Sequence, residues 1–248
     1  MKLKVLSANL WLLPPPASVE NNRRLDRFIR FAKKIDADVI NLQEVWLKEY
    51  VAKLRKGLSK YSVVSPRSII FNKSGLVTLT KAKPVSWKYH PHKNIPGVKL
   101  LEKFADKGFL RVKLEIEGEE YFVINTHIYQ SEDELKQKIK FEQTEGVLNY
   151  VKAHNPTILT GDFNMKPKEL PKLIKSFVRD QKFVSTYLAE NKYTFRAFNQ
   201  IMNWRGIYND TPDYVFLHSR AKGASVKTQV IAKPVVSDHY PILAEITV

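Results

Sequence analysis

Thr157-Ile158-Leu159-Thr160-Gly161-Asp162-Phe163-Asn164 is an apolar run that ends in a short polar cluster, and Ser237-Asp238-His239-Tyr240-Pro241 is a polar cluster that precedes a second run, Ile242 to Val248. Both runs have the composition of buried strands, so the polar groups are predicted where a strand meets a loop. Functional groups concentrate at such places, because a rigid scaffold positions the loop residues. The second cluster sets an acid beside a histidine, which exchanges protons near neutral pH. Together the two clusters indicate catalysis.

The rest of the chain alternates between strand-like runs and segments with helical spacing. Apolar runs typical of strands occur at 3–8, 39–42, 62–65, 68–71, 76–80, 109–116, 121–125, 157–160, 214–217, 226–231 and 241–248. Helical faces are predicted from Leu25, Phe28, Ile29, Ala32 and Ile35, after an N-cap at Asn21 or Asn22, and from Leu135, Ile139, Val147 and Val151, with a weaker helix at about 169–178. This order predicts an α/β chain of two packed sheets with helices outside. Since no linker or repeat interrupts it, we predict a single domain over 1–248.

The composition limits the chemistry and suggests partners. The 41 Lys and Arg against 25 Asp and Glu give a net charge of +16, which favours nucleic acid or an anionic phospholipid surface as a partner. The alternative is a lysine-rich surface that serves solubility or heat adaptation. The absence of cysteine excludes disulfides, thiolate nucleophiles and Cys-ligated zinc. Asp, Glu, Asn and His remain for metal chemistry, and oxygen ligands prefer Mg²⁺ or Mn²⁺.

The apolar runs are short. None approaches the roughly 18 residues needed to span a bilayer, and the first residues look like a strand rather than a signal peptide. We therefore expect a cytoplasmic protein without a transmembrane segment, and a monomer.

Two stretches interleave basic and aromatic residues, a mixture that suits phosphates and flat ligands. The first runs from Lys81 to Lys113, and the second from Lys192 to Arg205. The substrate-binding residues predicted from them are Lys103, Lys107, Arg196 and Trp204. Any single aromatic ring among them could equally be an ordinary core residue.

Six polar clusters stand beside predicted strand ends. They are Asn9, Gln43-Glu44, Asn125-Thr126-His127, Asp162 with Asn164, Asp213, and Asp238-His239. Each alone is more often structural than catalytic. As a set they supply what hydrolysis of a phosphodiester needs: a carboxylate for a divalent ion, a His or Asp to take a proton from water, and donors for the charge that develops on phosphorus oxygens.

The motifs resemble those of the endonuclease/exonuclease/phosphatase superfamily, over nearly the whole chain. They are Ser7-Ala8-Asn9-Leu10-Trp11, Asn41 to Val45, Asn125-Thr126-His127, Gly161 to Asn164, Pro212 to Phe216 and Ser237 to Pro241, in the family's order. The resemblance implies a deoxyribonuclease-like fold: two mainly antiparallel sheets in a four-layer α/β/β/α sandwich.

The resemblance also implies roles. Glu44 would be the main Mg²⁺ ligand, assisted by Asn9 and Asp238. Asp162 and Asn164 would orient the attacking water and the phosphate, while His127 would donate to the developing charge. His239, steered by Asp213, resembles the general base, although Asp162 is the alternative for that role.

The substrate is open between several classes. Asp106-Lys107-Gly108-Phe109 and Leu12-Leu13-Pro14 are similar to elements of the sphingomyelinase-like branch. The high positive charge instead favours a nucleic-acid phosphodiesterase, which we rank slightly ahead of a phospholipase C type lipid phosphodiesterase. A phosphomonoesterase is third. A noncatalytic polyanion-binding module on the same fold is the alternative outside enzymes.

Overall fold

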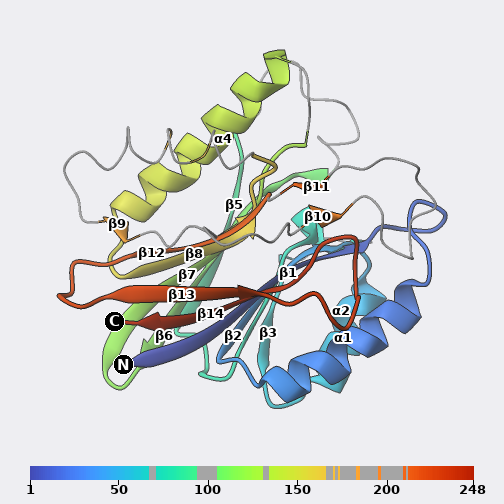
Figure 1. Cartoon of the computed structure of the whole chain (residues 1–248), viewed down its shortest axis with the longest axis horizontal. Coiled ribbons are helices and arrows are strands. Elements are labelled where there is room, and N and C mark those ends of the chain that lie inside the picture. The colour runs from blue at the N-terminus through green and yellow to red at the C-terminus, as the bar shows by residue number, and fades with distance from the viewer. Residues whose placement is uncertain are drawn as a thin grey trace.

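Two six-stranded sheets packed face to face form the centre of the computed structural model (Figure 1). The structure describes residues 1–66, 71–93, 105–130, 134–165, 170, 173, 183–184, 195–196, 209–210 and 212–248. The first sheet has the order β13 (Ser225–Val230), β14 (Ile242–Thr247), β1 (Lys2–Leu12), β2 (Val39–Val45), β4 (Val77–Thr80) and β3 (Ser62–Val64). The second has the order β5 (Ser86–Pro91), β6 (Gly108–Ile116), β7 (Glu119–His127), β8 (Thr157–Asp162), β12 (Asp213–His218) and β9 (Phe183–Val184).

Both sheets are mainly antiparallel, with one parallel pair at the centre of each. β1 pairs with β2 in parallel, and β7 pairs with β8 in parallel. A parallel pair needs a crossover connection, which α1 (Asn21–Ile35) supplies in the first sheet and α4 (Glu134–Lys152) in the second. Each sheet thus brings the carboxyl ends of two central strands to one edge.

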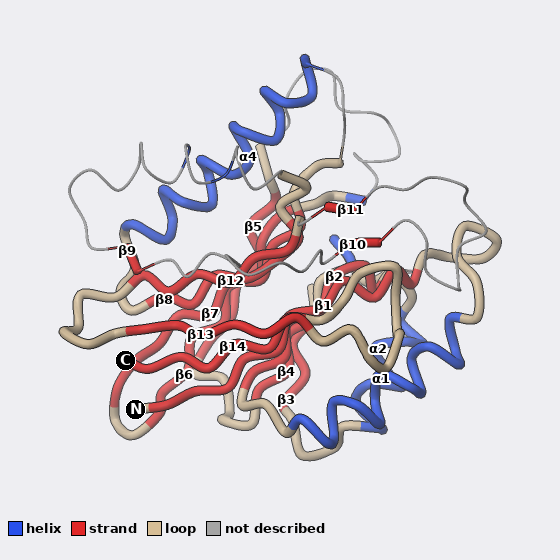
Figure 2. Tube along the Cα trace, in the orientation of Figure 1, coloured by secondary structure: helices blue, strands red, loops and turns tan. Residues whose placement is uncertain are grey.

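Helices cover the two outer faces, so the layers are helix, sheet, sheet and helix. Figure 2 shows α1 and α2 (Lys48–Gly57) beside the first sheet and α4 beside the second. Three apolar clusters separate these layers, and the middle one joins Val5 and Val39 of the first sheet to Val123 and Ile158 of the second. The predicted fold class is confirmed. Within the described ranges, no helix is long and apolar enough to cross a lipid bilayer.

Some predicted elements differ from the structure. α1 begins at Asn21, and the N-cap is Glu20, which has a left-handed backbone and no side-chain cap. The Asn21 side chain instead donates to the Leu13 carbonyl and accepts from Ser18 Oγ, which explains why it does not cap the helix. Helix α2 and strand β5 were not predicted from the sequence. Most of the strand predicted at 68–71 and of the helix predicted at 169–178 lies outside the described residues.

Two further short elements complete the described structure. A two-stranded ribbon pairs β10 (Phe195–Arg196) with β11 (Asn209–Asp210), and a 3₁₀ turn covers Lys73–Gly75.

Side chains alternate between the two faces of a strand, so every second residue of a central strand points into the space between the sheets. These inward side chains form successive layers from one end of the strands to the other. The inward positions of the four central strands read Val5, Ser7 and Asn9; Val39, Asn41 and Gln43; Val123, Asn125 and His127; and Ile158, Thr160 and Asp162. Each series runs from an apolar residue through a small or amide side chain to a polar residue at the strand end. The sandwich is therefore apolar at one end and polar at the edge where the predicted site residues lie.

Candidate active site

The first sheet contributes Asn9 from β1 and Glu44 from β2. Asn9 Nδ2 donates to Glu44 Oε1 at 3.3 Å and to Asp162 Oδ2 at 3.0 Å, while its Oδ1 accepts from the Trp11 amide at 2.9 Å. Glu44 has a left-handed backbone, with φ of 56°, which is unusual for a residue other than glycine. This conformation interrupts the alternation of β2, so Gln43 and Glu44 both reach the space between the sheets.

The second sheet contributes His127 from β7 and Asp162 from β8, which are neighbours in the parallel register. His127 Nε2 lies 3.7 Å from Asp162 Oδ2 and 3.8 Å from Glu44 Oε1. Asp162 Oδ1 accepts from the Asn164 amide at 2.9 Å, and the Asn164 side chain donates to the Ile128 carbonyl at 3.0 Å. Glu44 and Asp162 thus approach each other from opposite sheets.

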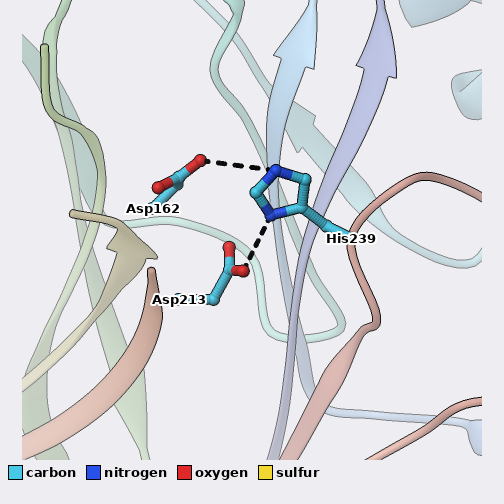
Figure 3. A group of neighbouring side chains, drawn as sticks. All are labelled: Asp162, Asp213 and His239. Carbon is cyan, nitrogen blue, oxygen red and sulfur yellow. Dashed lines mark hydrogen bonds and ion pairs between the residues drawn. The ribbon is translucent and has the colours of Figure 1, made fainter. Parts of the chain in front are cut away.

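An acid and histidine pair closes the group (Figure 3). His239 Nδ1 lies 2.8 Å from Asp213 Oδ2, and its Nε2 lies 3.9 Å from Asp162 Oδ2. Asp213 begins β12 and pairs in register with Asp162, whereas His239 comes from the segment before β14 in the other sheet. Nδ1 therefore donates to Asp213, and Nε2 faces Asp162.

Two further charged groups border the cluster. Lys107, which precedes β6, places Nζ 3.2 Å from His127 Nε2 and is 9% exposed. Asp238 is buried, and its Oδ1 accepts from Ser237 Oγ at 2.9 Å.

Burial and charge together set the protonation of these groups. Burial, reinforced by the negative charge of Asp238, raises the pKa of Glu44 to about 7. Burial, with the Lys107 charge nearby, holds the pKa of His127 well below its usual value. Burial also opposes charge on His239, but the Asp213 carboxylate outweighs it and raises the pKa of His239 well above its usual value. In this arrangement His127 is neutral and His239 is protonated.

The structure thus brings together nine of the predicted site residues: Asn9, Glu44, Lys107, His127, Asp162, Asn164, Asp213, Asp238 and His239. Lys103 and Trp204 lie outside the described residues, and Arg196 is described only as a position in β10. The roles assigned to these residues remain predictions.

Sequence reasoning missed Arg24, which is fully buried in α1. Arg24 donates to the carbonyls of Leu10 at 2.7 Å, Trp11 at 2.8 Å and Val236 at 3.1 Å. It therefore ties the exit of β1 to the segment that carries Asp238 and His239. The sequence gives little indication that Arg24 is buried, because Arg24 lies within a polar run, Asn21 to Arg24, that is typical of a solvent-exposed helix start.

The donor set fits a hard divalent cation. Glu44 Oε2 is buried and has no hydrogen-bond partner among the described residues, although a buried carboxylate oxygen normally has one. Asp162, Asp213 and His239 offer ligand atoms within 4.8 Å of one another. A cation bound beside Glu44 would satisfy the unpaired oxygen and would offset the burial and the Asp238 charge that raise the pKa of Glu44. Carboxylate and amide oxygens are ligands that Mg²⁺ prefers.

Clustered carboxylates beside an acid and histidine pair, at the edge of a two-sheet sandwich, define a hydrolase-type site. The chain belongs to the Endonuclease/Exonuclease/phosphatase family, whose model matches residues 6–239. Members of this family are phosphoesterase hydrolases.

Individual relatives are distant. A Drosophila melanogaster protein described as a "Putative neutral sphingomyelinase" is 24% identical over 185 residues, which cover 68% of this chain and 41% of that protein. The chain therefore spans less than half the length of this relative. Among solved structures, a mutant beta toxin from Staphylococcus aureus with bound magnesium ions has a TM-score of 0.81 at 21% identity, covering 98% of this chain and 99% of the toxin chain. D. rerio TDP2 complexed with a single-strand DNA product has a TM-score of 0.77 at 17% identity, covering 100% and 99%.

Proposed function

We propose that this chain is a divalent-metal-dependent phosphodiesterase, with Mg²⁺ as the expected ion and Mn²⁺ as an alternative. The observation that carries the proposal is the meeting of Glu44 and Asp162, from opposite sheets, beside the His239 and Asp213 pair. Glu44 would hold the ion, with Asp238 near it. Asn9 would also serve as a ligand if its amide turned its oxygen toward Glu44. When bound, the ion would neutralise charge on a non-bridging phosphate oxygen.

The remaining groups of the chain perform proton transfer and charge stabilisation. Asp213 fixes the tautomer of His239, so that Nε2 faces the space beside Asp162. The Asp162 carboxylate is placed to take a proton from water, and so is His239 Nε2 once the ring, which Asp213 holds in the protonated form, has lost its own proton. Lys107 and Asn164 supply donors at the rim of the same cluster, where they would stabilise the negative charge of the transition state.

A synthetic phosphodiester tests the reaction class directly. Hydrolysis of bis-p-nitrophenyl phosphate is expected with Mg²⁺ and is expected to stop when the ion is chelated. Glu44→Ala and His239→Ala should each lower turnover at least about a hundredfold while the far-ultraviolet circular dichroism stays unchanged. Glu49→Ala, which removes an exposed carboxylate from α2, is the matched control and should keep wild-type turnover. Near-normal activity in a purified Glu44 or His239 variant would contradict these roles. A wild-type protein that hydrolyses no phosphodiester, with or without Mg²⁺, would favour a noncatalytic polyanion-binding module.

For the substrate, the charge of the sequence ranks nucleic acid slightly ahead, but with the relative now known we propose a phospholipid of the sphingomyelinase-like class first. The Drosophila relative supports it, and so does the placement of the lysines. Lys107, predicted to bind substrate from the basic stretch Lys81 to Lys113, is buried beside His127, so it does not share one exposed surface with Lys88 and Lys93 of the same stretch.

Nucleic acid is the second candidate, because the charge of +16 and the resemblance to TDP2 both favour it. Wild type and Glu44→Ala should be compared on phospholipid vesicles, single-stranded DNA, duplex DNA and RNA. Metal-dependent cleavage of DNA or RNA with vesicles left intact would reverse the ranking.

A further inference from the structure

A set of buried polar side chains lies directly beneath the candidate active site, between the two sheets. Gln43 Nε2 donates to Asn125 Oδ1 at 2.7 Å, which links β2 to β7 across the gap. Asn125 Nδ2 in turn donates to the carbonyls of Leu42 at 2.9 Å and Val77 at 3.1 Å, both in the opposite sheet. All of these side chains are fully buried.

These contacts determine how the two amides are oriented. Because carbonyl oxygens can only accept, Asn125 must direct its NH₂ group at Leu42 and Val77, so its Oδ1 faces Gln43. Gln43 must then present Nε2 to Asn125. The bridge has one self-consistent arrangement.

The bridge is adjacent to two predicted functional groups. Gln43 immediately precedes Glu44 on β2, and Asn125 lies two residues before His127 on β7. Glu44 Oε1 and His127 Nε2, which are 3.8 Å apart, belong to different sheets, so their separation depends on how the sheets are placed relative to each other. Apolar packing alone is not directional, whereas a hydrogen bond fixes distance and angle.

A second link strengthens the same layer. Asn41 Nδ2 donates to Thr160 Oγ1 at 2.8 Å, and Thr78 Oγ1 donates to Asn41 Oδ1 at 2.7 Å. Thr160 lies two residues before Asp162, just as Asn125 lies two residues before His127. The two parallel strands of the second sheet, β7 and β8, are therefore both hydrogen bonded to the first sheet one step below the site.

We propose that Gln43 and Asn125 are positioning residues, which set the placement of Glu44 relative to His127 across the gap between the sheets. This inference rests on the proposed function for its effect on catalysis, but not for its effect on the structure. Burying amides is costly unless each polar atom is hydrogen bonded, and Gln43 Oε1 has no partner among the described residues, whereas an apolar pair would pack the sheets without that cost. The bridge therefore contributes geometry beyond packing.

The experiment compares the bridge with apolar packing on the same strand. Gln43→Met keeps the length and removes the donor, Asn125→Leu removes the partner, and the double variant removes both. The matched control is Val123→Ala, which opens a cavity at the inward position two residues below Asn125. Unfolding by urea identifies conditions in which every variant is folded. Two readouts are then measured: kcat and KM on bis-p-nitrophenyl phosphate with Mg²⁺, and the ring ¹⁵N resonances of His127 without metal.

Gln43→Met is expected to lower kcat at least about tenfold with KM changed less than about threefold, because small displacements of reacting groups are costly in rate. The double variant should be no less active than the worse single variant, since the two residues act as a unit. The His127 resonances should shift in Gln43→Met and stay in place in Val123→Ala.

Unchanged His127 resonances in folded Gln43→Met would overturn the proposal, as would an equal loss of kcat in Val123→Ala. If the wild type cleaves no phosphodiester with metal, the proposed function fails, and the resonances alone decide this inference.

Discussion

Lys107 changes what His127 can do. An ammonium group has donors only, so at 3.2 Å it must donate to His127 Nε2, which leaves the imidazole proton on Nδ1. The low pKa of His127 agrees with a neutral ring. In this arrangement Nε2 is occupied as an acceptor, so the donor role predicted for His127 passes in part to Lys107.

Lys107→Met should therefore lower kcat by about a hundredfold, because it removes a charged donor from the rim of the site. The measurement is kcat and KM on bis-p-nitrophenyl phosphate. Lys88→Met, on the exposed strand β5, is the control and should change kcat less than about twofold. Retention of wild-type kcat in Lys107→Met would exclude this role.

His92 allows a prediction about acid stability. Burial lowers the pKa of His92 to about 3, although a hydrogen bond to the His127 backbone acts in the opposite direction. The unfolded chain has a histidine pKa of about 6.5, so between these values the unfolded state binds more protons and stability falls as the pH falls. His92→Gln should lose less stability than the wild type between about pH 7 and pH 4. Urea unfolding at several pH values measures this, and parallel losses in the two proteins would refute it.

At the scale of elements, the two sheets repeat one unit. β1, α1 and β2 match β7, α4 and β8, and each unit ends its two parallel strands at the same edge. The strand ends Asn9 and Glu44 thus meet His127 and Asp162. The loops beyond these strand ends are held by other contacts. Arg24 donates hydrogen bonds to the carbonyls of Leu10, near the end of β1, and of Val236, in the segment before β14.

Arg24→Met should reduce the free energy of unfolding by roughly 2–4 kcal/mol, since several buried carbonyls lose their donor. Activity should fall too, because Val236 lies next to the segment that carries His239. Chemical denaturation measures the first effect. The adjacent Arg23 is exposed and pairs with Glu20, so Arg23→Met should cost less than about 0.5 kcal/mol. Equal losses in the two variants would argue against the role of Arg24.

At the scale of the whole molecule, the charge of +16 is a property of the surface rather than of the site. Inside the site, the buried carboxylates of Asp162, Asp213 and Asp238 gather beside the half-buried side chain of Glu44. A basic surface would attract an anionic substrate, and the acidic groups of the site would hold the divalent cation that the substrate then contacts.

Binding to anionic vesicles or to DNA should accordingly weaken as salt rises, by at least about tenfold between about 50 and 200 mM. DNA binding is measured by fluorescence anisotropy with labelled DNA, and vesicle binding by sedimentation. Both measurements use the Glu44→Ala variant, so that the substrate is not turned over. Binding that does not respond to salt would show that the charge has no part in recognition.

The sequence by itself determined most strands of the two sheets, two of the helices and the identity of the polar groups, because alternation and helical periodicity are local patterns that burial enforces. Strand β5 (Ser86–Pro91) was missed because it lies at an exposed sheet edge, and its alternating Trp87 and Tyr89 were interpreted as part of a basic and aromatic stretch. Helix α2 could have been found from Tyr50, Val51 and Leu54, which have helical spacing. Tertiary structure alone decided that one Glu44 oxygen has no hydrogen-bond partner within the described part of the chain, that Lys107 lies against His127 and that Gln43 reaches Asn125. Such contacts join residues that are far apart in the chain. The protonation of the site residues depends on their burial in the fold, which the spacing of residues in the sequence does not reveal.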